Sequence, residues 1–197
     1  MTQTSNQALL VIDFINDIVH PQGKLASCAA HSEEQQAIHH ANQAISYARE
    51  RGWKVIFVKI GFEPHYHAQP KHSPMFGKAH QYKALMLGSI GTDFHEALDV
   101  DTTSDIIISK PRVNPFYATS LEAVLRANNV SHLWICGVST EWAIQSAVRD
   151  AHDRDYEVTV LEDACAAGNA SQHQHSITML SRIARIMTVE EMLSAQP

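Results

Sequence analysis

The chain is 197 residues long, and 45% of its residues are hydrophobic and 18% charged. A chain of this length and composition can bury enough apolar surface to offset the entropy of ordering it. This excludes an intrinsically disordered protein and predicts one globular domain over residues 1–197. Fifteen Lys and Arg residues against 21 Asp and Glu residues give a net charge of −6, so nucleic acid is not an expected partner.

The N-terminal segment, residues 1–7, is polar, and the longest apolar run near it covers only residues 8–12. We therefore expect neither an export signal nor a membrane-spanning segment. The three cysteines, Cys28, Cys136 and Cys165, have no C-x-x-C spacing, which argues against a disulfide framework and a cysteine zinc site. A reducing cytoplasm is the expected location.

Short apolar runs alternate with segments of helical periodicity along the chain, as in repeated β-α-β units. Six runs predict strands buried on both faces, because they are apolar throughout and do not alternate. Right-handed crossovers between them predict an α/β fold, a doubly wound, mostly parallel six-stranded sheet with helices on both faces. The predicted strands are 8–14, 53–60, 105–109, 132–136, 157–161 and 184–188.

Helices are predicted where apolar residues recur at spacings of three and four. The first covers residues 33–51, with Gly52 as its C-terminal stop. Thr119 and Glu122 fit a capping box, Thr140 is placed to cap a helix over 141–153, and Ser171 to cap one that runs through Leu180. Residues 61–100 break the alternation, and we expect this loop-rich insertion to cover a substrate or contact another subunit.

Polar residues that end apolar strands are candidates for chemistry, because ligands bind beyond the carboxyl ends of strands in open α/β sheets. Asp13 ends the first strand, Lys110 ends the third, and the small-residue turn 137–140 follows the fourth. An Asp–Lys pair by itself is more often structural. A turn that opens a helix adds backbone N–H donors that can bind an oxyanion, so the three together predict a hydrolytic site that lacks a nucleophile.

These motifs resemble the isochorismatase-like, or cysteine hydrolase, superfamily along nearly the whole chain. The resemblance is carried by the segment 10–17, by Lys110-Pro111-Arg112, by the turn 136–140 and by the segment 147–151. It implies a catalytic triad of Asp, Lys and Cys, in which Asp13 and Lys110 match and Ala143 occupies the Cys position. It also implies a cis peptide between Val138 and Ser139, a small-molecule substrate and a homodimer or homotetramer.

Ala143 has no group that can attack a carbonyl, and three interpretations of it compete. The chain is an inactive Cys-to-Ala form of an enzyme that hydrolyses C–N bonds of a small amide, ureido or carbamoyl compound. Alternatively, it is a thiol-independent, isochorismatase-type enol-ether hydrolase that uses Asp13 as a general acid. The third interpretation is a non-catalytic small-molecule binding protein. We favour the first, because every other part of the predicted site is retained.

Other residues are candidates for substrate binding, with core packing as the alternative. Phe62, Phe116 and Trp142 each follow a strand end or open a helix, and Asn16 closely follows Asp13. Buried cysteines are expected to be inert.

The histidines of the insertion raise the question of a metal. The resemblance includes nicotinamidases that bind a metal through an Asp and histidines after the second strand. Here His65, His67 and His72 lack the matching Asp-x-His order. We predict no metal and no other cofactor.

Overall fold

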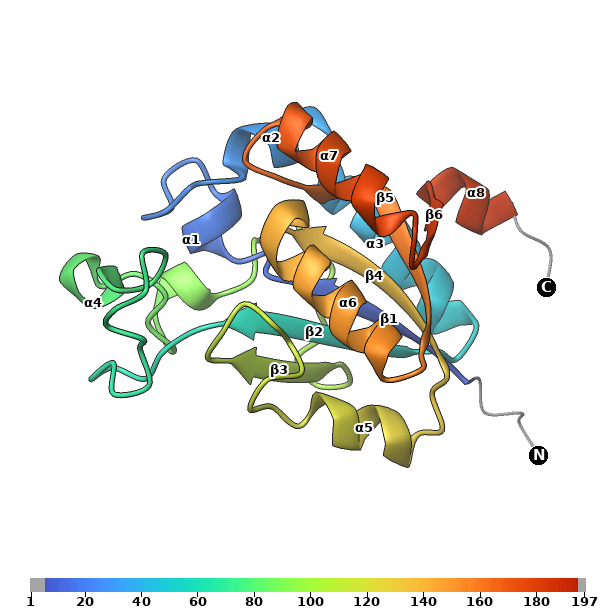
Figure 1. Ribbon diagram of the computed structural model, residues 1–197, viewed down its shortest axis with the longest axis horizontal. Helices are drawn as coiled ribbons and strands as arrows, with labels where there is room; N and C mark the ends of the chain where they lie inside the picture. Colours follow the sequence, from blue (N-terminus) through green and yellow to red (C-terminus); the bar gives the residue numbers. More distant parts are fainter. Residues whose placement is uncertain (1–5, 195–197) are drawn as a thin grey trace.

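Six parallel strands form one sheet at the centre of the computed structural model, which describes residues 6–194 (Figure 1). The strand order is β3-β2-β1-β4-β5-β6, and each neighbouring pair is parallel. The predicted α/β fold is therefore confirmed. The strands are β1 (Gln7–Ile12), β2 (Lys54–Ile60), β3 (Ile106–Lys110), β4 (His132–Val138), β5 (Glu157–Ala166) and β6 (Arg185–Met187).

Residues 1–5 and 195–197 lie outside the described residues, so the expectation about an N-terminal export signal falls mostly outside them. No helix of residues 6–194 is both long enough and apolar enough to cross a membrane.

Helices cover both faces of the sheet (Figure 1). On one face, α3 packs against β1, β2, β4 and β5, with α2 and α8 beside it. On the other face, α6 and α7 pack against β5. The α-helices are α1 (Asn16–Val19), α2 (Ala29–Glu34), α3 (Ala37–Glu50), α4 (Ala79–Tyr82), α5 (Leu121–Ala127), α6 (Gln145–Asp153), α7 (Ala170–Leu180) and α8 (Val189–Ser194).

The position of a binding crevice follows from the strand order. The chain winds outward from β1 through β2 to β3, then returns to β4 on the other side of β1 and continues to β6. The winding direction reverses between β1 and β4, and in doubly wound folds ligands bind at the carboxyl ends of the strands at this point. The residues that follow β1 and β4 are therefore placed to form a site.

The helix termini differ from three of the sequence predictions. The predicted helix 33–51 is two helices, because Gln36 adopts a left-handed conformation (φ 53°) between α2 and α3. Thr140 does not cap a helix, since its hydroxyl lies 2.9 Å from Nδ1 of His173. Asn169, and not Ser171, caps α7 by accepting a hydrogen bond from the Gln172 N–H at 2.9 Å.

The predicted capping box before α5 is also wrong. Ser120 occupies the N-cap position without a side-chain bond, and the Thr119 hydroxyl accepts from the Leu121 N–H at 3.2 Å. The Glu122 side chain points away from the cap and bonds to Arg126 at 2.7 Å. The Glu122 carboxylate thus bonds to Arg126 one turn further along the helix and not to the backbone N–H at the N-cap.

The connection between β2 and β3 contains the insertion, whose only regular elements within the described residues are α4 and the 3-10 helix η1 (Ile90–Thr92). It has a hydrophobic cluster of its own, to which Phe62, Tyr66, Phe76 and Leu85 contribute. The buried Asp17 carboxylate of α1 holds the insertion by accepting from the Leu85 N–H at 2.7 Å. A loop of this length is thereby ordered against the end of the sheet.

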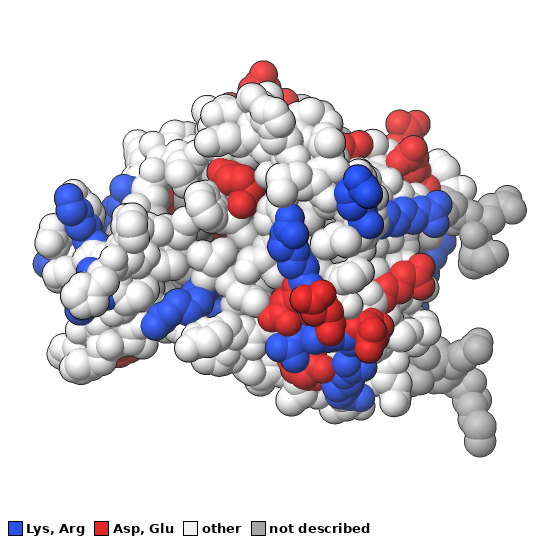
Figure 2. Space-filling model, in the orientation of Figure 1, with Lys and Arg blue, Asp and Glu red and all other residues white. Residues whose placement is uncertain are grey.

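Acidic and basic side chains lie side by side on the face formed by α5 and α6 (Figure 2). Around the insertion, the same view shows mainly basic side chains. Acidic and basic side chains are therefore distributed unevenly over the face that this view shows.

Candidate active site

Three chain segments converge at the reversal point of the sheet. Asp13 follows β1 directly, Lys110 is the last residue of β3, and the segment 138–143 leaves the end of β4. They line one pocket with a volume of about 300 Å³. The full lining is Asp13, Ile18, Leu25, Ser27, Ile60, Met75, Phe76, Leu85, Lys110, Val113, Val138, Ser139, Glu141, Trp142 and Ala143.

Asp13 and Lys110 form a buried ion pair on the pocket wall. The Lys110 Nζ lies 2.6 Å from the Asp13 Oδ2, and the two side chains are 1% and 4% exposed. The other carboxylate oxygen, Oδ1, accepts from the Ile60 N–H at 2.7 Å. Lys110 also donates to the carbonyls of Arg112 and Val113, at 3.2 and 3.0 Å. Both charged groups are thus held in fixed orientations.

Burial sets the protonation behaviour of this carboxyl group. Desolvation raises the pKa of Asp13 above its ordinary value, and the Lys110 ammonium and the Ile60 N–H oppose that rise. A carboxyl group with a raised pKa can give or take a proton closer to neutral pH than an exposed Asp. Asp13 also adopts a left-handed backbone conformation (φ 60°), which Asp tolerates better than most residues.

The turn after β4 forms the opposite wall of the pocket. Gly137 has φ +129°, and a Cβ atom added there would lie 2.1 Å from the Ile12 carbonyl oxygen, so only glycine fits. The peptide bond between Val138 and Ser139 is cis, as the sequence resemblance implies. The chain then enters a π-helix, η2 (Thr140–Ile144), in which Ala143 is buried at 4% exposure.

The model of the isochorismatase domain matches residues 7–191. The chain belongs to the isochorismatase family. Members of this family are hydrolases, and the family predicted from the motifs is confirmed.

Two relatives in the family are similar over most of their length. YecD of Escherichia coli O157:H7, an isochorismatase family protein, is 31% identical over 189 residues, which are 95% of each chain. The ureidoacrylate amidohydrolase RutB of Yersinia enterocolitica is 33% identical over 174 residues, covering 82% of this chain and 75% of the relative.

A solved structure extends the likeness to the fold. The crystal structure of a cysteine hydrolase from Pseudomonas syringae pv. phaseolicola has a TM-score of 0.84 and 23% identity, and covers 95% of this chain and 91% of that one. At this identity the likeness concerns the fold alone.

The structure brings only some of the predicted isochorismatase-family site residues together. Asp13, Lys110, Ala143, Val138 and Ser139 line the pocket. Trp142 lines it too, with 56% of its surface exposed.

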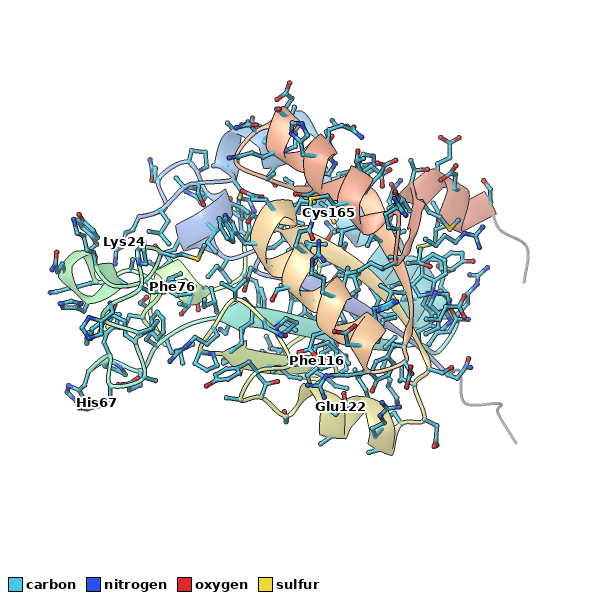
Figure 3. All side chains as sticks on the ribbon, in the orientation of Figure 1. Lys24, His67, Phe76, Phe116, Glu122 and Cys165 are labelled. Atoms are coloured by element: carbon cyan, nitrogen blue, oxygen red, sulfur yellow. The ribbon has the colours of Figure 1, made fainter. Side chains whose placement is uncertain are left out.

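Three predicted substrate-binding residues lie elsewhere. Asn16 donates to the Ile90 carbonyl at 2.8 Å and lines a different cavity. Phe62 is buried in the hydrophobic cluster of the insertion, and Phe116 packs on Tyr156 with 6.2 Å between ring centroids. Figure 3 shows Phe116 near Glu122, well apart from the pocket residue Phe76. Core packing explains both phenylalanines.

Several pocket residues were missed because they come from segments without a strand-end signal. Leu25 and Ser27 lie in the connection between α1 and α2, and Met75, Phe76 and Leu85 lie in the insertion. Two missed residues carried a detectable signal: Ile60 ends the predicted strand 53–60, and Glu141 is a charged residue at a predicted helix start directly after the turn motif.

None of the three cysteines supplies the thiol that Ala143 lacks. All three are buried, and none lines the pocket. Burial raises the pKa of Cys28 to about 12, and it also raises the pKa values of Cys136 and Cys165 well above the ordinary range. These groups are therefore protonated thiols at neutral pH, which are poor nucleophiles.

The residues also do not fit the metal site that some members of the family hold. Within residues 6–194, no group of three or more His, Cys, Asp or Glu side chains is arranged to hold a metal ion. His67 lies at the outer edge of the insertion in Figure 3, with its side chain 81% exposed.

Proposed function

We propose that the pocket binds a small amide, ureido or carbamoyl compound, and that the protein with Ala143 holds this ligand without hydrolysing it by a covalent route. The observation that carries the proposal is that Asp13, Lys110 and Ala143 line the same small pocket. The likeness to an amidohydrolase over 82% of this chain supports the ligand class.

The chemistry of the proposal follows from the buried pair. A thiol at position 143 would share the pocket with the Lys110 ammonium, which favours a thiolate, and with the Asp13 carboxylate, which can accept the thiol proton. The thiolate would attack the carbonyl carbon, and the C–N bond would break as Asp13 returns the proton to the departing amine. Water would then hydrolyse the thioester and release the acid and the thiol. The Ala143 methyl group cannot attack the carbonyl carbon, while Asp13, Lys110 and the turn after β4 still line the pocket.

The test is the substitution Ala143→Cys, assayed on a panel of small amides, ureas and carbamoyl compounds. We expect the variant to release ammonia at least about a hundredfold faster than the unmodified protein on one or more of them, since removing a catalytic nucleophile typically costs far more than that. Asp13→Asn in the Ala143→Cys background is the control, and it should abolish the gained activity. A variant that turns over no compound of the panel contradicts the proposal.

A second candidate is acid-catalysed cleavage of an enol ether, which needs no nucleophile from the protein, because water adds to the oxocarbenium ion that protonation forms. The raised pKa of Asp13 favours it, because a protonated carboxyl group could protonate the enol carbon. Against it, an enolpyruvyl ether carries a carboxylate, and Lys110, the one Lys or Arg among the described lining residues, is already paired with Asp13. Pyruvate release from such an ether by the unmodified protein, lost in Asp13→Asn, would favour this candidate over the first.

A further inference from the structure

Glu141 lines the pocket beside Asp13, and neither proposed reaction uses its carboxylate. It lies in η2 between Thr140 and Trp142. Its Oε1 atom accepts from the Gly168 N–H at 3.1 Å, which fixes the side chain against the connection between β5 and α7. Its Oε2 atom is buried and has no hydrogen-bond partner among residues 6–194.

The charges of the pocket do not balance. Among the described residues that line the pocket, Lys110 is the only Lys or Arg, and its ammonium is paired with Asp13 at 2.6 Å. Within the part of the chain that the structure describes, no cation lies within ion-pair distance of Glu141. The negative charge of Glu141 acts on the nearby Cys28 thiol. Burial is the main cause of the raised pKa of that thiol, and Glu141 is the second cause.

A carboxylate without a counter-charge at a pocket favours some ligands over others according to their charge. The Oε2 atom is closed to water, so a ligand does not reach it directly, but the carboxylate as a whole carries a charge that no cation offsets. A cationic nitrogen or an N–H donor in the pocket lowers the cost of burying that charge. A carboxylate ligand would instead meet a like charge between walls that are largely apolar, where repulsion is screened less than in water.

We infer that Glu141 selects ligands that present an N–H donor or a cationic nitrogen, such as the terminal –NH2 of an amide or urea or an amidinium group, and rejects carboxylates. This inference rests on the proposed function, because it concerns the same pocket, and it narrows the ligand class by charge. An anionic ureido compound such as ureidoacrylate is then a poorer ligand than a neutral urea.

The experiment is a calorimetric titration of the unmodified protein with three probes that share one ring and differ in one group: benzamidine, benzamide and benzoate. We expect benzamidine and benzamide to bind at least about tenfold more tightly than benzoate, the factor that one charge-assisted hydrogen bond provides. The fluorescence of Trp142 at the pocket wall should change on binding, and this change should be lost in Trp142→Phe. Trp53 and Trp134 stack on each other at the other end of the strands.

Glu141→Gln is the decisive variant, because glutamine keeps an oxygen for the Gly168 N–H and removes the charge. The ratio of benzamidine to benzoate affinity should fall at least about tenfold. Glu50→Gln, an exposed carboxylate at the end of α3, is the matched control and should leave the ratio unchanged. A thermal unfolding curve checks that Glu141→Gln is folded, and if it is not, the affinity order of the unmodified protein decides.

Three results would overturn the inference: benzoate binding as tightly as benzamidine, an unchanged affinity ratio in Glu141→Gln, or no saturable binding of any of the three probes. These results are separate from the test of the proposed function, which measures hydrolysis by Ala143→Cys. Charge selection at Glu141 with no hydrolysis in that variant would reject the reaction and keep the binding site.

Discussion

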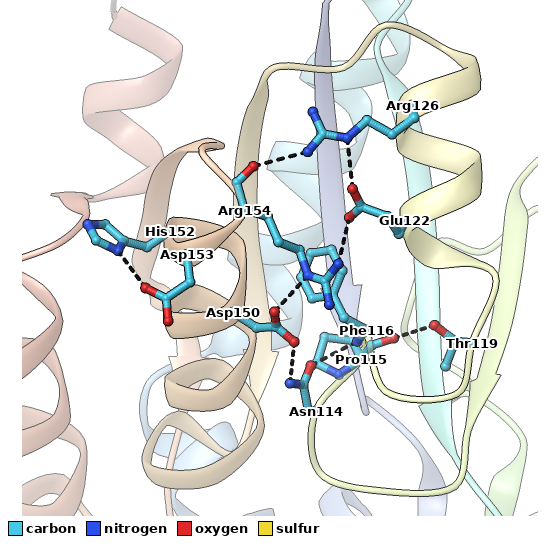
Figure 4. Close-up of polar contacts among 10 residues, drawn as sticks. All are labelled: Asn114, Pro115, Phe116, Thr119, Glu122, Arg126, Asp150, His152, Asp153 and Arg154. Atoms are coloured by element: carbon cyan, nitrogen blue, oxygen red, sulfur yellow. Dashed lines mark hydrogen bonds and ion pairs between the residues drawn. The ribbon is translucent and has the colours of Figure 1, made fainter.

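Two aspartate–cation pairs in this protein have the same distance and different surroundings. Asp13 and Lys110 are 2.6 Å apart in the pocket, with side chains 4% and 1% exposed. Asp150 and Arg154 are also 2.6 Å apart, on the surface of α6, with side chains 24% and 37% exposed. In Figure 4 the surface pair is one part of a chain of contacts with Asn114, Glu122 and Arg126.

The difference shows that distance alone does not identify a functional ion pair. The surface pair is screened by water, and each member has further partners that can replace the lost one. The pair in the pocket has given up its hydration, so each charge depends on the other and on a few backbone groups. Because the pair is buried, removing one partner should lower the stability of the fold, and the raised pKa of Asp13 suits it to proton transfer.

The same substitution at the two aspartates tests this comparison most strongly. Asp13→Asn leaves the Lys110 ammonium buried without its counter-charge, and we expect the free energy of unfolding at pH 7 to fall by about 3–5 kcal/mol. Urea unfolding measures the loss. Adding Lys110→Met to Asp13→Asn should recover part of it, because the unpaired charge is then gone. A loss below about 1 kcal/mol would make the buried pair no different from a surface pair.

A buried polar contact without an ion pair should have an intermediate effect. His173 packs 5.4 Å from the His31 ring, and burial together with His31 lowers the pKa of His173 to about 4. Since the unfolded chain takes up this proton near pH 6.5 and the folded chain only near pH 4, stability is complete above that window and falls as the pH decreases through it. We expect the contribution to be on the order of 3 kcal/mol.

The measurement compares the unmodified protein with His173→Gln by urea unfolding at several pH values between 4 and 7. The dependence of the unfolding free energy on pH should be shallower in the variant. His132→Gln provides a second case for the same measurement. Burial lowers the pKa of His132 too, and this histidine lies away from the pocket. Identical pH dependence in the His173 variant and the unmodified protein would show that this histidine is not buried in its neutral form.

The smallest effect is expected at the surface pair. Asp150→Asn should lower the free energy of unfolding by less than about 1 kcal/mol, because the ion pair it removes is exposed to solvent. The remaining difference should shrink further in 1 M salt, which screens such pairs. A salt-independent loss as large as that of Asp13→Asn would mean that the two pairs are equivalent after all.

The fold could be predicted from the sequence largely because its central strands are buried on both faces. The prediction of two buried faces is wrong for the edge strand β3, in which Ile107 and Ser109 are exposed. All six predicted strands are present, since continuous apolar runs such as β1 leave little doubt about burial. The helix boundaries were less predictable. The break at Gln36 depends on the left-handed conformation of that residue. The Thr140 hydroxyl contacts His173, which is distant in sequence, and does not cap the helix as predicted.

The candidate site was predictable only where it follows the sheet. Asp13, Lys110 and the turn 137–140 end strands, so the topology alone brings them to one edge. The insertion obeys no such rule, and its packing decides that Phe76 lines the pocket while Phe62 is covered. Glu141 could be noticed in the sequence, but its unpartnered oxygen depends on the position of Gly168 in another connection.

Gly137 has a practical consequence for anyone who wishes to redesign the protein. Its missing side chain lets β4 approach Ile12, directly before Asp13, so a library that varies this position would mostly yield misfolded chains. Leu25, Met75 and Trp142, in contrast, line the same pocket and are 41%, 44% and 56% exposed. Substitutions at these three positions would change the shape of the pocket and leave Gly137, Asp13 and Lys110 in place.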